Sequence, residues 1–216
     1  MIKVMIADDQ ELIRKSLHML IGSNPDMEIT GMAANGQEIQ NIVAKNQPDV
    51  IIMDIRMPII DGVQCTKHIL EKYPKIKILV LTTFDDDEYI SDAIKYGASG
   101  YLLKGEPVEN IVSAIRKVYF GDVVLSQQAM KLLVKMVAKN EIPAINQKES
   151  KLRYSSLTRS EAEIVDQVIE GYSNKEIANI LHLSEGTVRN YLSNILGKLE
   201  LRDRTQLAIW AMKQKK

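Results

Sequence analysis

Short apolar runs alternate with amphipathic stretches through the first half of the chain. The apolar runs predict strands at 2–7, 28–33, 49–53, 77–82 and 100–103. The amphipathic stretches predict helices at 11–21, 36–46, 63–73, 88–96 and 107–120. Such an alternation predicts a doubly wound α/β fold, a (βα)5 unit whose five-stranded parallel sheet has helices on both faces. Residues 50–53 and 78–81 are uninterrupted apolar runs, as central strands of such a sheet should be.

The strand pattern stops near Val123, and the rest of the chain has a helical pattern. An amphipathic stretch at 127–139 predicts a helix that extends from the first domain. Residues 140–153 contain Pro143 and many polar side chains, which predicts a linker. Beyond it we expect an all-α domain with four helices, at 159–170, 174–181, 185–199 and 204–213. The predicted domains are therefore 1–122 and 154–216, joined by a helical and flexible linker at 123–153.

Polar residues at the expected helix starts support the helices of the second half. Thr158 with Glu161, and Ser173 with Glu176, have the spacing of capping boxes, in which a hydroxyl and a carboxylate satisfy free backbone amides. Single N-caps are expected at Ser184 and Asp203.

Composition points away from membranes and disulfides. Of the 216 residues, 45% are hydrophobic and 26% charged, as in globular proteins. No apolar run approaches the roughly 18–20 residues that cross a bilayer, and the N-terminus lacks the regions of a signal peptide. The one cysteine, Cys65, excludes an intramolecular disulfide and a cysteine-based zinc cluster. We therefore expect a cytoplasmic protein that has no membrane partner.

The formal net charge of zero conceals a polarity. Residues 1–122 carry 13 Lys and Arg against 18 Asp and Glu, whereas residues 123–216 carry 15 against 10. An acidic half suits a cation and a basic half suits a polyanion. An unevenly charged solvent surface is the alternative interpretation.

Ionisable or hydroxyl side chains stand at the ends of four of the five predicted strands. Asp8 and Asp9 follow the first strand and Asp54 follows the third. Thr82 ends the fourth strand and Lys104 follows the fifth. Because ligands of an open parallel sheet bind outside the carboxyl ends of its strands, these side chains should converge on one pocket.

Three clustered carboxylates favour a metal ion, because each makes its neighbours harder to ionise unless a cation binds them. Oxygen ligands favour Mg²⁺, with Mn²⁺ as a close substitute. Beside such a metal, Asp54 could attack phosphorus and form an aspartyl phosphate. The metal and Lys104 would neutralise charge on the transferring phosphoryl oxygens.

This arrangement resembles the receiver domain of two-component response regulators, a flavodoxin-like fold. The matching residues are Asp8-Asp9, the segment Asp54-Ile-Arg-Met-Pro58-Ile-Ile-Asp-Gly62, Thr82 and Lys104. The resemblance implies that Asp54 is the phosphoacceptor. It also implies that Asp9, Asp54 and the backbone carbonyl of Arg56 ligate Mg²⁺, while Asp8 holds the metal through water. Thr82 would hydrogen-bond the phosphoryl group, and Tyr101 would be an aromatic switch residue.

Two positions near the pocket qualify this picture. The family usually has Pro, or in this branch often Asp, after the lysine, but Gly105 follows Lys104 here. A cis peptide therefore cannot be assumed at that bond, because the cis preference belongs to bonds that precede proline. Asp61 fits a helix cap better than a metal ligand.

The basic half contains the pattern of a helix, a tight turn and a second helix. Residues 171–178 read Gly-Tyr-Ser-Asn-Lys-Glu-Ile-Ala, and residues 183–191 read Leu-Ser-Glu-Gly-Thr-Val-Arg-Asn-Tyr. One face of the second helix is apolar and the opposite face is polar. Arginine can pair bidentately with guanine, and asparagine with adenine, in the major groove of DNA.

This half resembles the LuxR-type, or NarL/FixJ-type, helix-turn-helix output domain. The resemblance rests on residues 157–161, 173–178, 183–184, 187–190, 198–199 and 204–206. It implies binding to double-stranded promoter DNA. We expect base readout by Arg189, Asn190 and Ser193. Backbone contacts are expected from Lys175, Ser184, Thr187, Tyr191 and Lys198.

Together the two resemblances imply a bacterial response regulator that controls transcription. A partner sensor histidine kinase would phosphorylate Asp54, and the phosphorylated protein would form a homodimer on paired half-sites. The expected last helix offers Leu207, Trp210 and Ala211 for pairing, although Trp210 serves equally well as a core residue. Apart from self-catalysed phosphoryl transfer and autodephosphorylation, no enzymatic activity is expected.

Three other functions remain open at this point. An aspartate-dependent phosphohydrolase would use Asp54 as its nucleophile, but it needs a second carboxylate where the chain has Arg56, and a substrate cap. The helical half could be a protein-docking module whose charged face only aids solubility. The first half could also regulate DNA binding without phosphate, although the acidic triad with Thr82 and Lys104 argues against that.

Overall fold

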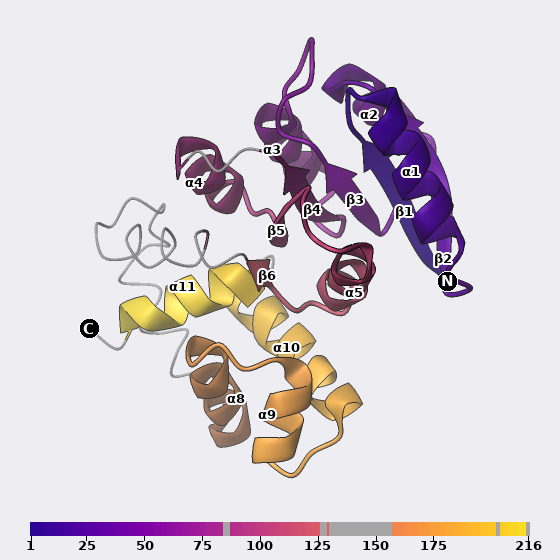
Figure 1. Cartoon of the computed structure of the whole chain (residues 1–216). Helices are drawn as coiled ribbons and strands as arrows, with labels where there is room; N and C mark the ends of the chain where they lie inside the picture. The colour runs from indigo at the N-terminus through magenta and orange to yellow at the C-terminus, as the bar shows by residue number, and fades with distance from the viewer. Residues whose placement is uncertain (84–86, 126–128, 130–156, 202–203, 215–216) are drawn as a thin grey trace. The chain divides into compact units, whose positions relative to one another are not determined.

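The computed structural model describes residues 1–83, 87–125, 129, 157–201 and 204–214. They belong to two compact units, one built on Met1–Tyr119 and the other containing the helices from Arg159 onward (Figure 1). The predicted linker at 140–153 and the predicted cap at Asp203 lie outside the described residues. So does the predicted helix at 127–139, except for residue 129.

The first unit is a parallel sheet with helices on both faces, as the alternating pattern predicts. Its strands are β1 (Ile2–Ala7), β2 (Met27–Ala33), β3 (Val50–Met53), β4 (Lys77–Thr82), β5 (Gly100–Leu103) and β6 (Val124–Leu125). Neighbouring strands pair in the order β2-β1-β3-β4-β5-β6, and every pair is parallel. The five predicted strands are therefore confirmed, and β6 is an addition. Its two residues are too few to show a strand period.

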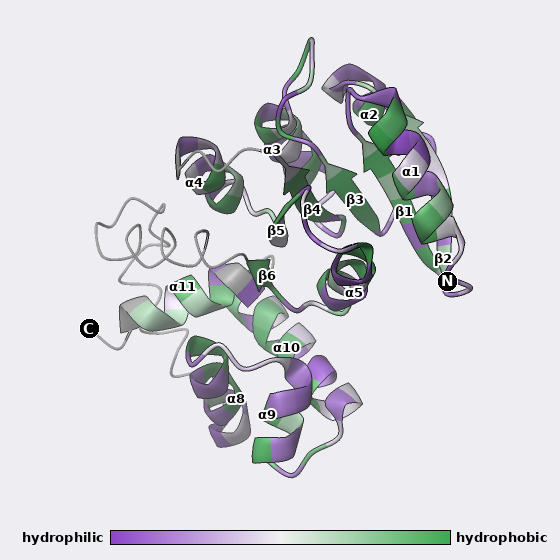
Figure 2. Ribbon diagram, in the orientation of Figure 1, coloured by the Kyte–Doolittle hydropathy of each residue, from purple (hydrophilic) through white to green (hydrophobic). Residues whose placement is uncertain are grey.

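The helices of this unit are α1 (Glu11–Gly22), α2 (Gly36–Val43), α3 (Gly62–Lys72), α4 (Asp87–Lys95) and α5 (Val108–Tyr119). Side chains of α1 and α5 form one core cluster with the strands, and α2, α3 and α4 lie in sequence on the other face (Figure 1). The strands between the two helical layers carry the most hydrophobic colouring in Figure 2. Every residue of β3 is buried, which explains its uninterrupted apolar sequence.

The second unit contains, among its described residues, α8 (Arg159–Ile169), α9 (Asn174–Ile180), α10 (Glu185–Leu199) and α11 (Arg204–Gln214). Both predicted capping boxes are present, at Thr158 with Glu161 and at Ser173 with Glu176. Ser184 caps α10 by accepting a hydrogen bond from the Thr187 amide, at 3.0 Å. These caps fix where α8, α9 and α10 begin, and the starts of all four described helices agree with the predicted ones.

The last helix differs from the expectation of a pairing face. Leu207, Trp210 and Ala211 are all buried in the core that α11 shares with α8, α9 and α10. Trp210 exposes only 2% of its surface. These three side chains stabilise the helical unit itself, so they do not offer an apolar face for dimerisation.

Among the described residues, we find no helix with the length and apolar composition needed to cross a bilayer.

Candidate metal centre and nucleic-acid interface

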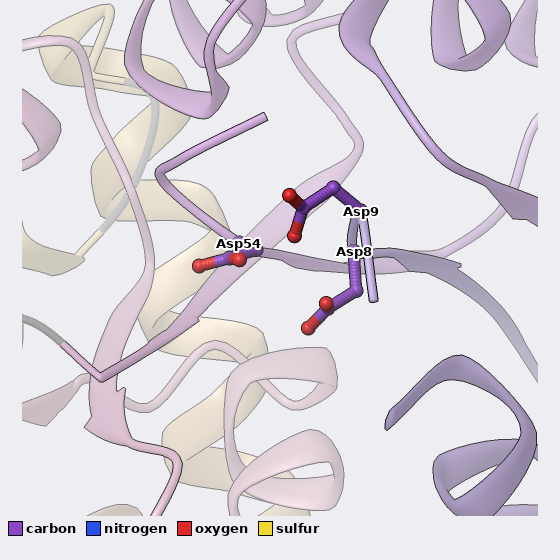
Figure 3. Close-up of side chains that lie close together, drawn as sticks. All are labelled: Asp8, Asp9 and Asp54. Carbon is purple, nitrogen blue, oxygen red and sulfur yellow. The ribbon is translucent and has the colours of Figure 1, made fainter. Parts of the chain in front are cut away.

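Three carboxylates converge at the carboxyl ends of β1 and β3. Asp8, Asp9 and Asp54 each place a carboxylate oxygen within 4.8 Å of the others (Figure 3). Asp8 and Asp54 are buried, with 2% and 4% of their surface exposed, while Asp9 is exposed. The parallel register explains the convergence, because Ala7 at the end of β1 pairs with Met53 at the end of β3. The predicted acidic cluster is therefore present in the structure.

Lys104 reaches into the same cluster from the end of β5. Its Nζ lies 2.7 Å from Asp8 Oδ2 and 2.8 Å from Asp54 Oδ2, and the lysine side chain is almost fully buried. The Lys104 amide donates to the Thr82 carbonyl at 2.8 Å, which fixes Lys104 beside the end of β4. Thr82 itself is fully buried. Thr82 is thus held next to Lys104. This agrees with the prediction from their positions at the ends of neighbouring strands.

The electrostatics of the pocket follow from burial and charge. Burial is the main cause that raises the pKa of Asp54, and the charge of Asp8 raises it further, against the opposing effect of Lys104. Burial works to lower the pKa of Lys104, but its hydrogen bonds to Asp54 and Asp8 outweigh burial and raise it. Lys104 is therefore held as a cation, while burial opposes the ionisation of Asp54.

The segment after Asp54 folds back so that Gly62 packs against the backbone of Asp54 and Ile55. The Gly62 amide donates to the Ile55 carbonyl at 2.8 Å. A Cβ at Gly62 would lie 1.9 Å from the carbonyl oxygen of Asp54, so any side chain at this position clashes with backbone. The Ile55 amide also donates to Asp54 Oδ1 at 2.8 Å, which orients that carboxylate. Glycine at position 62 thus allows the close return that positions Asp54.

The residues of the pocket fit a hard divalent cation. Their donor atoms are carboxylate oxygens, the type that Mg²⁺ and Mn²⁺ prefer. A bound cation would also offset the burial and the repulsion from Asp8 that raise the pKa of Asp54. Asp61 is not part of this set, since it caps α3 by accepting a hydrogen bond from the Gln64 amide at 2.8 Å. The predicted capping role of Asp61 is confirmed.

The structure also places three other residues that were named from the sequence. Tyr101 is buried in β5, with 1% of its surface exposed. Arg56 lies in the segment between β3 and α3, and its side chain is exposed.

Cys65 is buried on α3, where burial raises the pKa of its thiol to about 12. A thiol of that kind is inert, as the sequence suggests. The described residues contain no cis peptide bond, so the bond between Lys104 and Gly105 is trans.

The helix-turn-helix pair is formed by α9 and α10. The polar face of α10 presents Asn190 and Ser193 to solvent, and Lys175 is exposed on α9. Arg189 is half-buried, and its guanidinium donates to Glu185 one turn earlier, at 3.1 Å. Tyr191 packs partly against the helical core. Arg189, Asn190 and Ser193 thus stand on a helix whose opposite, apolar face is buried in the core of the unit.

Three of the predicted backbone contacts to DNA already have structural partners. The Ser184 hydroxyl caps the Thr187 amide and lies 2.8 Å from the Thr187 hydroxyl. Lys198 Nζ contacts both carboxylate oxygens of Glu161, at 2.7 and 2.8 Å. The sequence indicates Glu161 only as a capping residue, so its second role in holding α10 to α8 was missed.

Comparison with known protein families agrees with this geometry. The response regulator receiver domain matches residues 4–116, and the luxR family of bacterial regulatory proteins matches residues 155–211. The chain belongs to the two-component response regulators with a LuxR-type DNA-binding domain. Such a response regulator is a regulator of transcription.

Individual relatives match the chain over nearly all of their length. The chain is 40% identical to the transcriptional regulatory protein LnrK of Bacillus subtilis (strain 168), over 99% of this chain and 97% of that protein. It is 38% identical to the oxygen regulatory protein NreC of Staphylococcus carnosus (strain TM300), over 99% and 98%. Among solved structures, the response regulator ChrA of a heme-sensing two-component system matches with a TM-score of 0.52 and 30% identity, over 99% of this chain and 98% of that one.

Proposed function

We propose that this response regulator is switched by phosphorylation of Asp54, with Mg²⁺ or Mn²⁺ bound beside it. The observation that carries the proposal is the cluster of Asp8, Asp9 and Asp54 with Lys104 bound to two of the three carboxylates. Asp9, Asp54 and the Arg56 carbonyl would hold the metal, and Asp8 would hold it through water. When bound, the metal neutralises charge on the phosphoryl oxygens.

The chain's own residues supply the rest of the transfer. A carboxylate oxygen of Asp54 forms the new bond to phosphorus while the bond from phosphorus to the donor breaks. With a sensor histidine kinase as donor, the imidazole nitrogen leaves with the electron pair of that bond. Lys104 stabilises the phosphoryl oxygens with its ammonium group, and the Thr82 hydroxyl donates a hydrogen bond to one of them. Tyr101 follows this rearrangement as the switch residue.

The output of the switch is sequence-specific binding to double-stranded promoter DNA. Arg189, Asn190 and Ser193 read base edges from α10. Phosphate contacts are assigned to Lys175, Ser184, Thr187, Tyr191 and Lys198. Since one short recognition helix reads few bases, the phosphorylated protein binds as a homodimer on paired half-sites. We place this activity in the bacterial cytoplasm, with the regulatory and output domains at 1–122 and 154–216.

The proposal is tested by DNA binding before and after treatment with acetyl phosphate and Mg²⁺. The probe is a set of genomic fragments selected by the treated protein. Treatment should strengthen binding by the wild-type chain and should have no effect on Asp54→Asn. The matched control is Asp61→Asn, which removes a nearby carboxylate but keeps a good helix cap. Equal activation of Asp54→Asn and the wild type would refute the switch.

A further inference from the structure

Arg56 links the segment that follows Asp54 to helix α4. Its backbone lies two residues after Asp54, and its guanidinium lies over the ring of Tyr89 on α4, 5.7 Å from the ring centre. A cation within roughly 6 Å of an aromatic face is attracted by the negative charge of that face. This contact therefore joins the backbone beside the acidic cluster to a helix on the outer layer of the receiver.

Backbone hydrogen bonds hold the residues that follow Arg56 in the same segment. The Gly36 amide donates to the Ile60 carbonyl at 3.1 Å, and the Ile60 amide donates to the Pro58 carbonyl at 2.8 Å. Between them Ile59 has a φ of 72°, which is a strained conformation for a β-branched residue. The hydrogen bonds of Ile60 therefore restrain the later part of this segment, and the contact of Arg56 with Tyr89 ties its earlier part to α4.

Helix α4 is a firm anchor for this contact. Ile90, Ala93 and Ile94 are buried on its inner side. A second contact of the same kind lies near the end of the helix, where Lys67 Nζ of α3 is 5.5 Å from the ring centre of Tyr96. Lys67 is not in the segment that follows Asp54. The two tyrosines therefore make the same kind of contact, but only Tyr89 touches a residue of the metal-binding segment.

We infer that Tyr89 is a positioning residue for the metal site, because its ring holds the Arg56 side chain and so orders the Arg56 backbone carbonyl. The inference rests on the proposed function, which assigns that carbonyl to the metal. Coupling of this kind is reciprocal, so metal in the pocket also steadies α4 by the same factor. Tyr89 would then make α4 a part of the receiver that responds to metal.

The size of the effect follows from the exposure of the two groups. Arg56 is exposed and Tyr89 half-buried. A cation–ring contact at such a site corresponds to about a two- to five-fold change in an equilibrium constant. Replacing Tyr89 by leucine should therefore weaken metal binding about two- to five-fold.

The experiment is a titration of the full chain with Mn²⁺, followed by electron paramagnetic resonance of the free ion. Tyr89→Leu should show the predicted loss of affinity. Tyr89→Phe keeps the ring and should bind Mn²⁺ like the wild type, while Tyr96→Leu makes the same change at the other contact and should also be unaffected. Arg56→Met removes the cation of the same contact at an exposed position. It should also lower the affinity for Mn²⁺, so it tests the inference even if Tyr89→Leu folds poorly.

Hydrogen exchange of α4 supplies the reciprocal measurement. Mn²⁺ should slow amide exchange in α4 of the wild type and of Tyr96→Leu, but not of Tyr89→Leu. In the double variant Tyr89→Leu/Arg56→Met, the loss of affinity should be no larger than in Arg56→Met alone, since Arg56→Met already removes the contact with Tyr89.

The outcomes separate this inference from the proposed function. If the wild type binds Mn²⁺ and both Tyr89→Leu and Arg56→Met bind it equally well, the inference is overturned and the metal site stands. The inference is also overturned if Tyr96→Leu loses as much affinity as Tyr89→Leu. If the wild type binds no more Mn²⁺ than Asp54→Asn does, the metal site of the proposed function fails, and the inference fails with it.

Discussion

The ion pair between Lys198 and Glu161 makes a direct prediction about the stability of the helical unit. Glu161 is buried, with 4% of its surface exposed, and also accepts hydrogen bonds from the Thr158 amide and hydroxyl. Lys198 supplies the balancing charge at 2.7 and 2.8 Å. Lys198→Met keeps most of the apolar stem and removes the ammonium group, leaving the carboxylate without its cation.

The magnitude lies between two reference cases. Breaking a fully buried ion pair costs about 3–5 kcal/mol, whereas an exposed pair contributes about 0–1 kcal/mol. The Lys198 side chain is 42% exposed, so water already screens the pair and can partly replace the ammonium. We therefore expect Lys198→Met to lower the free energy of unfolding by about 1–2 kcal/mol at neutral pH.

The pH dependence has a definite sign. Burial works to raise the pKa of Glu161, but Lys198 and the hydrogen bonds from Thr158 outweigh it and hold the pKa below its usual value. A carboxyl whose pKa is lowered by folding stabilises the protein above its unfolded pKa of about 4.3. That stability is lost as the pH falls through the folded pKa. The difference between wild type and Lys198→Met should therefore be largest at neutral pH and shrink below about pH 4.

Urea unfolding followed by tryptophan fluorescence measures this difference. The only tryptophan of the chain, Trp210, lies in the core of the helical unit, so its emission reports the unfolding of that unit. Arg159→Met is the control, because its pair with Glu163 has an arginine side chain that is 94% exposed. It should change stability by less than about 0.5 kcal/mol. Equal effects of the two variants, or a Lys198→Met effect that does not change with pH, would refute the reasoning.

Two further predictions concern the receiver and the recognition helix. Gly62→Ala should destabilise the chain by about 1–3 kcal/mol in thermal unfolding followed by circular dichroism, because its Cβ would lie 1.9 Å from the Asp54 carbonyl oxygen. Gly22→Ala, whose Cβ meets nothing within 4 Å, should cause no loss, so a loss as large as that of Gly62→Ala would contradict the steric argument. Arg189→Ala should cost about 1–3 kcal/mol in binding to selected operator fragments and less on random DNA. Equal losses on both, measured by fluorescence anisotropy, would mean that Arg189 contacts only phosphate.

The fold and the acidic pocket could be predicted because they depend on short-range patterns and on a rule of sheet geometry. Apolar runs such as 50–53 identify buried strands, and the carboxyl ends of parallel strands meet at one edge. Asp8, Asp54 and Lys104 therefore had to lie close together once the sheet formed. Helix starts were predictable for a similar reason, since a cap such as Ser173 acts within one turn of chain.

Features that depend on packing between distant segments could not be predicted. The stack of Arg56 on Tyr89 requires the placement of α4 beside the segment after β3, which no local pattern encodes. The pair between Lys198 and Glu161 requires the packing of α10 on α8. For Trp210, a helical period shows that one face is apolar but not whether that face meets its own domain or a partner. The structure shows that Trp210 lies in the core of its own domain.

The central claim is that a metal-bound acidic cluster lets Asp54 accept a phosphoryl group. The most direct measurement is the intact mass of the full chain after incubation with acetyl phosphate, with Mg²⁺ or with a chelator, followed by mapping of the modified residue. The account predicts a gain of one phosphoryl group, on Asp54, only when Mg²⁺ is present. A gain that is equal in the chelator, that maps to another residue, or that never occurs would contradict it.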